Sequence, residues 1–251
     1  MNPKICIMGI PISGLKRDEF IAAARDAMRS GKKVLFTTVN AHSMVQAQKR
    51  PDFFAHFQQA DFVLPDGILP VWAGRLLGFD IPERVAGTDF TQPFLAMAER
   101  ENFSVFFLGA TQTTLDKIRA ICKIKYPSLV ISGCIAPPFG EWDEETDRRI
   151  IASINSSSPD ALFVGMTAPK QELWLSKNCE KLNVKFMMGV GAVFDYLAGT
   201  KKRAPYWLGQ IGLEWLPRLI REPRRLWRRN LDSVVFIYLF FKLHGKQLFL
   251  R

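Results

Sequence analysis

Residues 161–172 read ALFVGMTAPKQE, and this stretch shows how the chain is built. A short apolar run at 161–164 is followed by a loop with Gly165 and Pro169, and then by a helical pattern from Lys170 onward. Proline is favoured in the first turn of a helix, because the N–H that it lacks would have no partner inside the helix there. The stretch therefore predicts a buried strand, a tight loop and a helix, in that order.

The same alternation of apolar strand and helix extends in both directions from this stretch. Continuous apolar strands separated by helices are typical of a parallel sheet that is covered on both faces. We therefore expect an α/β fold with a parallel sheet and helices on both of its faces. A first strand is expected at 5–10, and further strands at 33–38, 62–64, 104–108, 129–132, 161–164 and 184–188. Helices are expected at 18–30, 41–49, 51–60, 70–77, 89–101, 113–126, 144–153, 170–178 and 192–198.

The charge of the chain is unevenly distributed. The 251 residues carry a formal net charge of +10, and residues 201–251 hold twelve Lys or Arg against three acids. Such a basic tail predicts an anionic partner, for which nucleic acid, anionic lipid and a phosphorylated substrate are the candidates. The composition changes after Gly199, so we expect a core at 1–199, which the resemblance described below makes catalytic, and a basic appendage at 200–251.

The appendage combines arginines with apolar residues. Four arginines follow one another at helical spacing, which would place them on one helix face: Arg218, Arg221, Arg225 and Arg228. Pro217 and Pro223 interrupt the segment and predict short helices in place of one long helix. The apolar run at 234–241 is shorter than the roughly 20 residues that a membrane-spanning helix needs. We expect the appendage to lie on a membrane without crossing it.

The N-terminal apolar run predicts a cytoplasmic protein. Residues 5–10 are too few for the apolar part of a signal peptide, Pro11 interrupts the run, and no small-residue cleavage motif follows. Together with the basic appendage, this favours a location on the inner face of the cell membrane, as a peripheral protein.

Polar residues stand at the ends of two predicted strands, where parallel sheets bind ligands. Thr38 and Asn40 close one strand, although Asn40 would equally suit the N-cap of the following helix. Asp66 follows another strand and precedes Gly67. Its carboxylate could act as a general base or only form part of a Pro-Asp-Gly turn. Arg84 could hold phosphate oxygens or lie in solvent.

Two glycine-containing loops follow later strands. Gly165 and Gln171 belong to the first loop. This loop could bind an anion through backbone N–H groups at the helix start, or it could be an ordinary connection between a strand and a helix. Gly189 and Gly191 begin a partial G-x-G-x-x-G pattern in which Phe194 replaces the third glycine, and no ribose-binding acid follows about 20 residues on. This disfavours a nicotinamide cofactor. Asp195, next in the chain, either contacts a nucleotide or supports the turn.

Neither a metal nor a cofactor is expected. The chain contains no D-x-D motif, and its three histidines lack the spacing of metal ligands. If a phosphorylated substrate reacts here, cationic side chains or backbone N–H groups of the protein itself would have to stabilise its leaving group.

Several of these segments together resemble a known family. Asp66-Gly67, VGMTAPKQE, GVGAVFDYLAG and the block KRAPYWLGQIGLEWLPRLIREPRRLWRR are similar to the WecG/TagA/CpsF glycosyltransferases, glycosyltransferase family 26. The last block, with A-P-x-W, G-L-E-W and E-P-R-R in order, is the most specific. The resemblance covers roughly residues 5–230, and the extension 231–251 lies beyond it.

The resemblance implies an inverting, metal-independent transfer of a sugar from a UDP-sugar to a polyprenyl-diphosphate-linked saccharide in cell-surface polysaccharide biosynthesis. It implies a Rossmann-like core and an appendage that completes the site at the anionic membrane surface. Asp66 matches the general base. Thr38 and Asn40 match residues around the donor sugar, and Arg84 and Gln171 match residues that line the pocket. The remaining matches are Asp195 with Gly165, Gly189 and Gly191 on the UDP-sugar side, and Arg218, Arg225 and Arg228 at the diphosphates.

The resemblance does not choose the donor. Residues 133–140 read GCIAPPFG, whereas relatives often carry a more polar, aromatic loop there. UDP-N-acetylmannosamine, its uronic acid and UDP-glucose remain open, because a few contacts in one pocket decide between such sugars. Self-association into a homo-oligomer is also open.

Two other functions fit parts of the sequence. A nucleic-acid-binding protein could use the basic tail and would show strongly salt-dependent affinity, but the apolar run at 234–241 fits lipid better, so we expect no nucleic-acid partner. A Rossmann-type oxidoreductase would need the glycine and the acid that the second glycine loop lacks.

Overall fold

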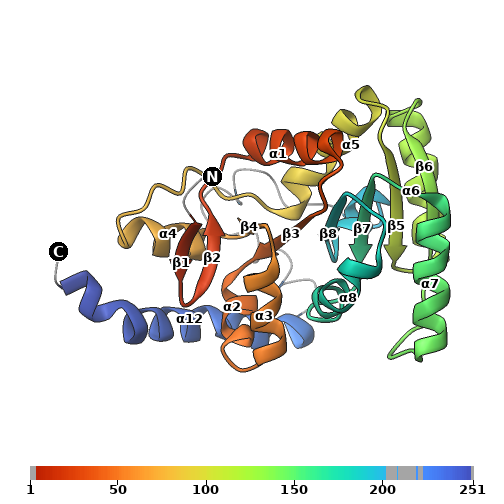
Figure 1. The fold of residues 1–251 in the computed structure, drawn as a ribbon. Coiled ribbons are helices and arrows are strands. Elements are labelled where there is room, and N and C mark those ends of the chain that lie inside the picture. The colour runs from red at the N-terminus through yellow and green to blue at the C-terminus, as the bar shows by residue number, and fades with distance from the viewer. Residues whose placement is uncertain (1–3, 202–207, 209–218, 220–222, 250–251) are drawn as a thin grey trace. The chain divides into compact units, whose positions relative to one another are not determined.

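The computed structural model describes residues 4–201, 208, 219 and 223–249, with side chains of the last range described at 227 and 231–248 (Figure 1). Two compact units are formed. The first consists of Met1–Lys16, Thr38–Ala86 and Arg203–Arg251, and the second of Arg17–Thr37 and Gly87–Lys202. The expected boundary after residue 199 rests on composition and stays a prediction.

A six-stranded parallel sheet flanked by helices confirms the α/β, Rossmann-like fold (Figure 1). Its strand order is β4-β3-β8-β7-β5-β6. The strands are β3 (Val34–Val39), β4 (Phe62–Pro65), β5 (Ser104–Gly109), β6 (Val130–Ile135), β7 (Ala161–Gly165) and β8 (Phe186–Gly189). Because all strands run the same way, their carboxyl ends define the edge at which ligands are expected.

Aromatic packing holds the second unit together. The ring centroids of Phe94 and Phe186 lie 4.5 Å apart, and Phe94 meets Phe163 edge to face at 5.0 Å. All three side chains are fully buried, so truncating any one of them to Ala would cost about 3–5 kcal/mol. The helices of this unit are α1 (Arg17–Ser30), α5 (Gly87–Arg100), α6 (Gln112–Lys125), α7 (Glu144–Ser157), α8 (Lys170–Asn178), the 3-10 turn η1 (Cys179–Lys181) and α9 (Val193–Leu197).

The first unit begins with a hairpin where one strand was expected. Strands β1 (Lys4–Ile7) and β2 (Ile10–Ser13) pair antiparallel in a separate two-stranded sheet. Met8 and Gly9 between them have φ values of 51° and 80°, and positive φ at both central residues is the geometry of the tightest hairpin turns. The prediction of a single strand at 5–10 is therefore wrong. The unit also contains α2 (Ala41–Ala47), α3 (Pro51–Gln59), α4 (Ile68–Leu76) and α12 (Pro223–Phe249).

Helix α12 is a single helix of 27 residues, which corrects the expectation that Pro223 would limit the tail to short helices. Pro223 stands at the first position of the helix, where a missing N–H has no cost. Pro217 lies outside the described residues. Within the described ranges, no helix is both long enough and apolar enough to cross a membrane.

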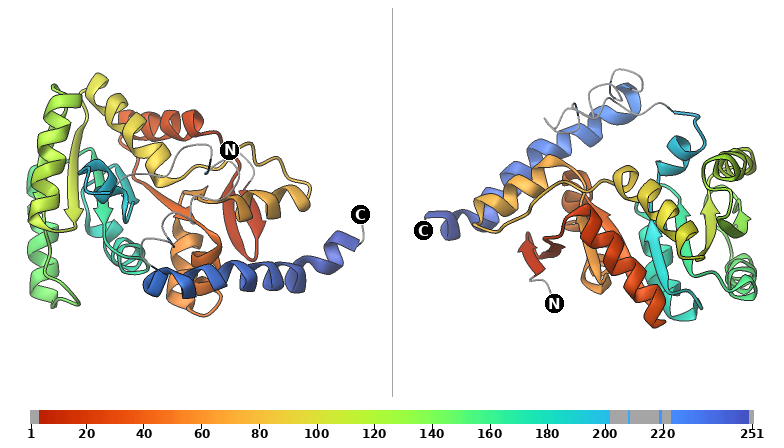
Figure 2. Two further views of the ribbon diagram at one scale, coloured as in Figure 1. Left: turned by 180° about the vertical axis from the view of Figure 1, so that it is seen from behind. Right: turned by 90° about the horizontal axis from the view of Figure 1, so that it is seen from above.

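Inside the first unit, α12 packs along α2 (Figure 2). Phe236 and Phe240 are buried on its inner side. Asp232 on the same side lies 2.5 Å from Nδ1 of His42 and accepts a hydrogen bond of 3.0 Å from Gln46. Farther along, the Met8 backbone N–H donates to Nε2 of His244 at 2.9 Å. The C-terminal helix is therefore attached to the unit by polar as well as apolar contacts.

Candidate functional site

In the first unit, the end of β3 passes directly into helix α2. The side-chain oxygen of Asn40 accepts a hydrogen bond of 3.0 Å from the Ser43 N–H, and the Asn40 N–H donates to the Ser43 hydroxyl at 2.8 Å. This reciprocal capping box satisfies two N–H groups that a helix start leaves open. The capping interpretation of Asn40 is confirmed. Thr38 and Asn40 are both half-buried at this strand end, and their role at a donor sugar stays a prediction.

Asp66 lies against that strand end. Its backbone N–H donates to the Val39 carbonyl at 2.8 Å. Gly67 then turns the chain into α4 with a φ of 120°, a value that L side chains rarely adopt, and a β-carbon placed there would lie 3.9 Å from Cβ of Asn40. The turn brings the half-buried Asp66 and Asn40 to one place in the fold. A carboxylate in this position has the partial burial that suits a general base.

The loop that contains Arg84 lies beside the end of β4. The N–H of Val85, the neighbour of Arg84, donates to the Pro65 carbonyl at 2.9 Å. Arg75 holds the loop closed, with Nε and Nη2 donating to the carbonyls of Ile81 at 3.1 Å and Pro82 at 3.0 Å. Sequence analysis did not select Arg75, because its partners are backbone carbonyls that carry no residue-specific signal.

In the second unit, Gln171 joins two loops. Its side-chain oxygen accepts hydrogen bonds from the N–H groups of Gly191 at 2.8 Å and Met166 at 3.3 Å. Its nitrogen donates to Oε1 of Glu172 at 2.8 Å. Only 4% of Gln171 is exposed. A β-carbon on Gly189 would come within 2.9 Å of the amide nitrogen, so Gly189 leaves the space that Gln171 fills.

Phe194, which stands in place of a third glycine, packs onto Gly165. A β-carbon at Gly165 would lie 2.3 Å from the Phe194 ring. Phe194 also meets Phe107 edge to face, with centroids 5.6 Å apart. The side chain of Asp195 forms an ion pair of 3.1 Å with Lys201, and its carbonyl accepts from the Thr200 and Lys201 N–H groups. These contacts tie Asp195 to the segment that follows α9, and both expected roles of Asp195, at a nucleotide or in the glycine turn, stay predictions.

Asp147 has a role that sequence analysis missed. It is one of several acids in the first turn of α7, but it is buried. Its carboxylate accepts from the indole N–H of Trp174 at 2.6 Å and of Trp142 at 3.3 Å, and Lys177 lies 3.4 Å away. Burial opposes ionisation, but these partners outweigh it and hold the pKa of Asp147 below its ordinary value.

A local signal for the burial of Asp147 does exist. The residue shares a helix face with the buried Ile150 and Ile154, at spacings of three and seven. An acid on the apolar stripe of a helix indicates a buried, hydrogen-bonded carboxylate.

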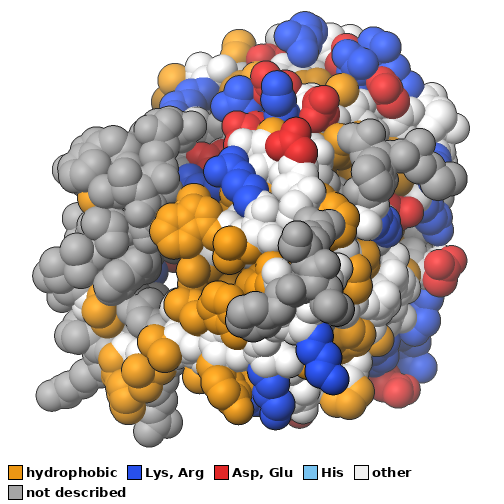
Figure 3. Space-filling model, turned by 90° about the vertical axis from the view of Figure 1, so that its left-hand side faces the viewer, with side chains coloured by type: hydrophobic (Ala, Val, Ile, Leu, Met, Phe, Trp, Pro, Cys, Tyr) orange, Lys and Arg blue, Asp and Glu red, His pale blue; other side chains and the backbone are white. Residues whose placement is uncertain are grey.

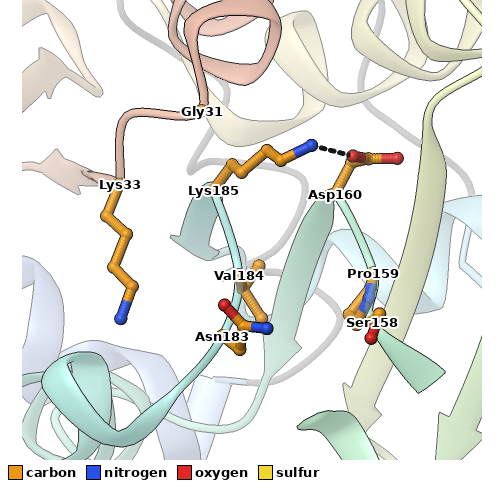
Figure 4. Close-up of a pocket in the computed structure, with 8 residues that line it drawn as sticks. All are labelled: Gly31, Lys33, Ser158, Pro159, Asp160, Asn183, Val184 and Lys185. Atoms are coloured by element: carbon orange, nitrogen blue, oxygen red, sulfur yellow. Dashed lines mark hydrogen bonds and ion pairs between the residues drawn. The ribbon is translucent and has the colours of Figure 1, made fainter. Parts of the chain in front are cut away.

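A cavity of 210 Å³ lies elsewhere in the second unit (Figure 4). Its lining comes from residues that precede β3, β7 and β8, so it sits at the amino ends of these strands. Lys185 and Asp160 form an ion pair of 2.7 Å at its edge. None of the residues predicted for the site lines it. The lining residues are Gly31, Lys33, Ser158, Pro159, Asp160, Asn183, Val184 and Lys185.

The predicted arginines of the appendage cannot be placed in the site. Arg218 lies outside the described residues, whereas Arg225 and Arg228 belong to α12 with side chains that are not described. Among the described residues, no group of three or more His, Cys, Asp or Glu side chains gathers as a metal site would require.

The sequence matches the family described as Glycosyl transferase WecG/TagA/CpsF family over residues 5–248. This match includes most of 231–251, a segment expected to lie beyond the resemblance. The chain is 31% identical over 206 residues to the N-acetylglucosaminyldiphosphoundecaprenol N-acetyl-beta-D-mannosaminyltransferase of Bacillus spizizenii, covering 82% of this chain and 78% of the relative. It is 28% identical over 238 residues to the enzyme of the same name from Staphylococcus aureus, covering 94% and 91%. The protein therefore belongs to the WecG/TagA/CpsF family and is a glycosyltransferase.

Proposed function

We propose that this enzyme is an inverting, metal-independent glycosyltransferase that moves a sugar from a UDP-sugar to a polyprenyl-diphosphate-linked saccharide. The names of its relatives describe transfer of N-acetylmannosamine to N-acetylglucosaminyldiphosphoundecaprenol, which supports the same acceptor class and an N-acetylmannosamine-type donor. A glucose-type donor is the alternative. The observation that carries the proposal is Asp66, a carboxylate on a tight turn at the carboxyl end of β4.

The reaction is one displacement at the anomeric carbon of the donor. Asp66 takes the proton of the acceptor hydroxyl as its oxygen bonds to that carbon, while the bond from the carbon to the UDP oxygen breaks. Attack from the face opposite UDP inverts the configuration. A well-placed general base typically contributes about 10²–10⁴-fold in rate.

The charge that develops on UDP is stabilised by the protein in this proposal. Arg84, near the end of β4, and the appendage residues Arg218, Arg225 and Arg228 supply cations to the diphosphates of donor and acceptor. Thr38 and Asn40 contact the donor sugar. The loops with Gly165, Gly189, Gly191 and Asp195 receive the UDP moiety, and Gln171 keeps two of these loops in place through its paired amide.

The outer side of α12 supports membrane association. Its exposed apolar residues recur at spacings of three and four: Leu231, Val234, Tyr238 and Phe241. Lys242 adds a charge 6.0 Å from the Tyr238 ring. Amphipathic helices with this combination lie in the membrane interface. We place the enzyme peripherally on the inner face of the cell membrane, where an anionic surface is its partner. Packing of this stripe against a second copy is the alternative occupant.

The test is release of UDP by purified enzyme with a panel of UDP-sugars and diphosphate-linked N-acetylglucosamine on a lipid. Release that depends on the acceptor and occurs with one donor would establish the reaction and name the sugar. Inversion is checked by the anomeric configuration of the product, and metal independence by full turnover in the presence of a chelator. Acceptor-independent hydrolysis, or no release with any donor, would contradict the proposal.

A further inference from the structure

Helix α4 exposes an apolar stripe to solvent. Trp72 is 51% and Leu76 56% exposed, and Phe79, just beyond the helix, is 37% exposed. Trp72 and Leu76 are four residues apart in the helix, which places them on one side, and Phe79 follows three residues after Leu76. Figure 3 shows hydrophobic side chains gathered on the face of the molecule where α4 lies, with Lys and Arg around them. Clustered exposed apolar side chains of this size are typical of a binding surface.

The opposite side of α4 is closely packed. A β-carbon at Gly74 would lie 2.2 Å from Cδ1 of Ile81, and Val71, Ala73 and Leu77 are buried. The helix therefore already has an apolar face for the interior of the first unit. The outer stripe is additional, and folding of this unit does not explain it.

In the sequence, the stripe lies between Asp66 and Arg84, two groups of the proposed mechanism. Asp66 precedes α4 by one turn residue, and the chain after the helix returns so that the Val85 N–H bonds to the Pro65 carbonyl. Arg75 secures this return through the carbonyls of Ile81 and Pro82. Residues 65–85 thus form one closed loop, with Asp66 at its start, Arg84 at its end and the apolar stripe between them.

We propose that the stripe of Trp72, Leu76 and Phe79 binds the polyprenyl chain of the acceptor. This inference rests on the proposed function. An acceptor whose sugar hydroxyl meets Asp66 and whose diphosphate meets Arg84 continues into its lipid, and α4 is an exposed apolar helix in the closed loop that carries both groups. Burial of successive isoprene units against the stripe raises the affinity with chain length, because apolar burial is roughly proportional to area.

The experiment compares acceptors that differ only in the length of the isoprenoid chain, in solution below their critical micelle concentration and without vesicles. We expect kcat/KM of the wild type to rise with chain length, through KM. In Trp72→Ser/Leu76→Ser this dependence should flatten, so that the ratio of kcat/KM for long over short chains falls several-fold. Leu76→Ser alone should lower this ratio by a smaller factor. The matched control is Ile124→Ser on α6, because Ile124 is 81% exposed and far from the loop in sequence; it should keep the wild-type ratio.

A second measurement does not depend on folding of the variants. A photoreactive group on the first isoprene unit of the acceptor should crosslink wild-type enzyme within residues 68–82. Crosslinks confined to other peptides would overturn the inference.

Other occupants of the stripe would give different results. A retained chain-length ratio with weakened binding to phosphatidylglycerol vesicles would assign the stripe to the bilayer and overturn the inference. A retained ratio with a dimer converted to monomers would assign it to a second copy, with the same consequence. In both cases the wild type still transfers sugar, so the proposed function stands. Absence of transfer by the wild type with every donor would instead remove the proposed function, and this inference with it.

Discussion

The β4–α4 turn and the β7–α8 loop occupy equivalent positions, each leading from a buried parallel strand into a helix, but they use their polar residues differently. In the β7–α8 loop, the buried amide of Gln171 bonds to two backbone N–H groups and to Glu172. The β4–α4 turn is held by backbone bonds through the Asp66 and Val85 N–H groups, and the Asp66 side chain remains half-buried. A polar residue after a strand can therefore link loops through its own side chain, as Gln171 does, or stand on a turn that backbone hydrogen bonds hold, as Asp66 does.

Replacing Asp66 should give the largest effect on the reaction. Asp66→Asn removes the proposed base but keeps the size of the side chain and the backbone bonds of the turn. We expect kcat to fall by about 10²–10⁴-fold, with a melting temperature close to that of the wild type. The measurements are steady-state UDP release at saturating substrates and thermal unfolding.

The matched control for this substitution is Asp80→Asn, which changes an exposed carboxylate of the same unit and should leave both quantities unchanged. Wild-type turnover in Asp66→Asn would show that Asp66 is scaffold in the same way as Gln171, and the contrast between the two loops would disappear.

Replacing Gln171 should affect stability first. Gln171→Ala leaves the N–H groups of Met166 and Gly191 without their acceptor, and a buried donor without a partner costs about 1–3 kcal/mol. We expect a lower free energy of unfolding in urea, and reduced activity because the two loops lose their link. Gln112→Ala is the control, because Gln112 is exposed on α6 and its side chain bonds to Asp116 of its own helix at 2.8 Å. Equal stability of both variants would contradict the scaffold interpretation.

The local pattern predicted the elements of the sheet closely. The apolar run 161–164 became β7 at Ala161–Gly165, and the helix expected at 170–178 is α8 with those bounds. Such runs can be recognised from the sequence alone, because the periodicity of apolar residues that indicates a strand or a helix is set by neighbouring residues. Two local predictions were wrong: the single strand across Met8 and the short helices around Pro223. A non-glycine residue at positive φ gives no composition signal, and a proline at a helix start resembles a proline that breaks a helix.

The candidate site was less predictable, because its contacts are long-range. Gln171 was selected correctly as a residue of interest, but its partner Gly191 lies 20 residues away and no periodicity links them. The link from Asp232 to His42 spans 190 residues. Asp66 was selected because it follows a strand. Its position beside Asn40 could not be predicted, because it depends on the pairing of β3 with β4 in the folded sheet.

Replacing Asp147 should have a smaller effect on stability than replacing Gln171. Asp147 supports α8 through its hydrogen bond from Trp174, and so bears on how the β7–α8 region is held. The folded-state pKa of this carboxyl is lowered. Its contribution to stability is therefore present above the unfolded-state pKa of about 3.9 and is lost as pH falls through the folded-state pKa. Asp147→Asn should be less stable than the wild type by about 1 kcal/mol at neutral pH, and the difference should shrink below about pH 4.

Urea unfolding of both proteins across this pH range measures the difference directly. The pKa of Asp160 is also lowered: burial opposes its ionisation, but Lys185 and Ser104 outweigh that effect. Asp160 therefore adds its own acid sensitivity. Because Asp160 is present in both proteins, its contribution cancels in the difference, and the remaining pH dependence belongs to position 147. A gap of constant size at all pH values would mean that Asp147 supports α8 by shape and hydrogen bonding alone. Ionisation of the carboxylate would then contribute nothing to the support of α8.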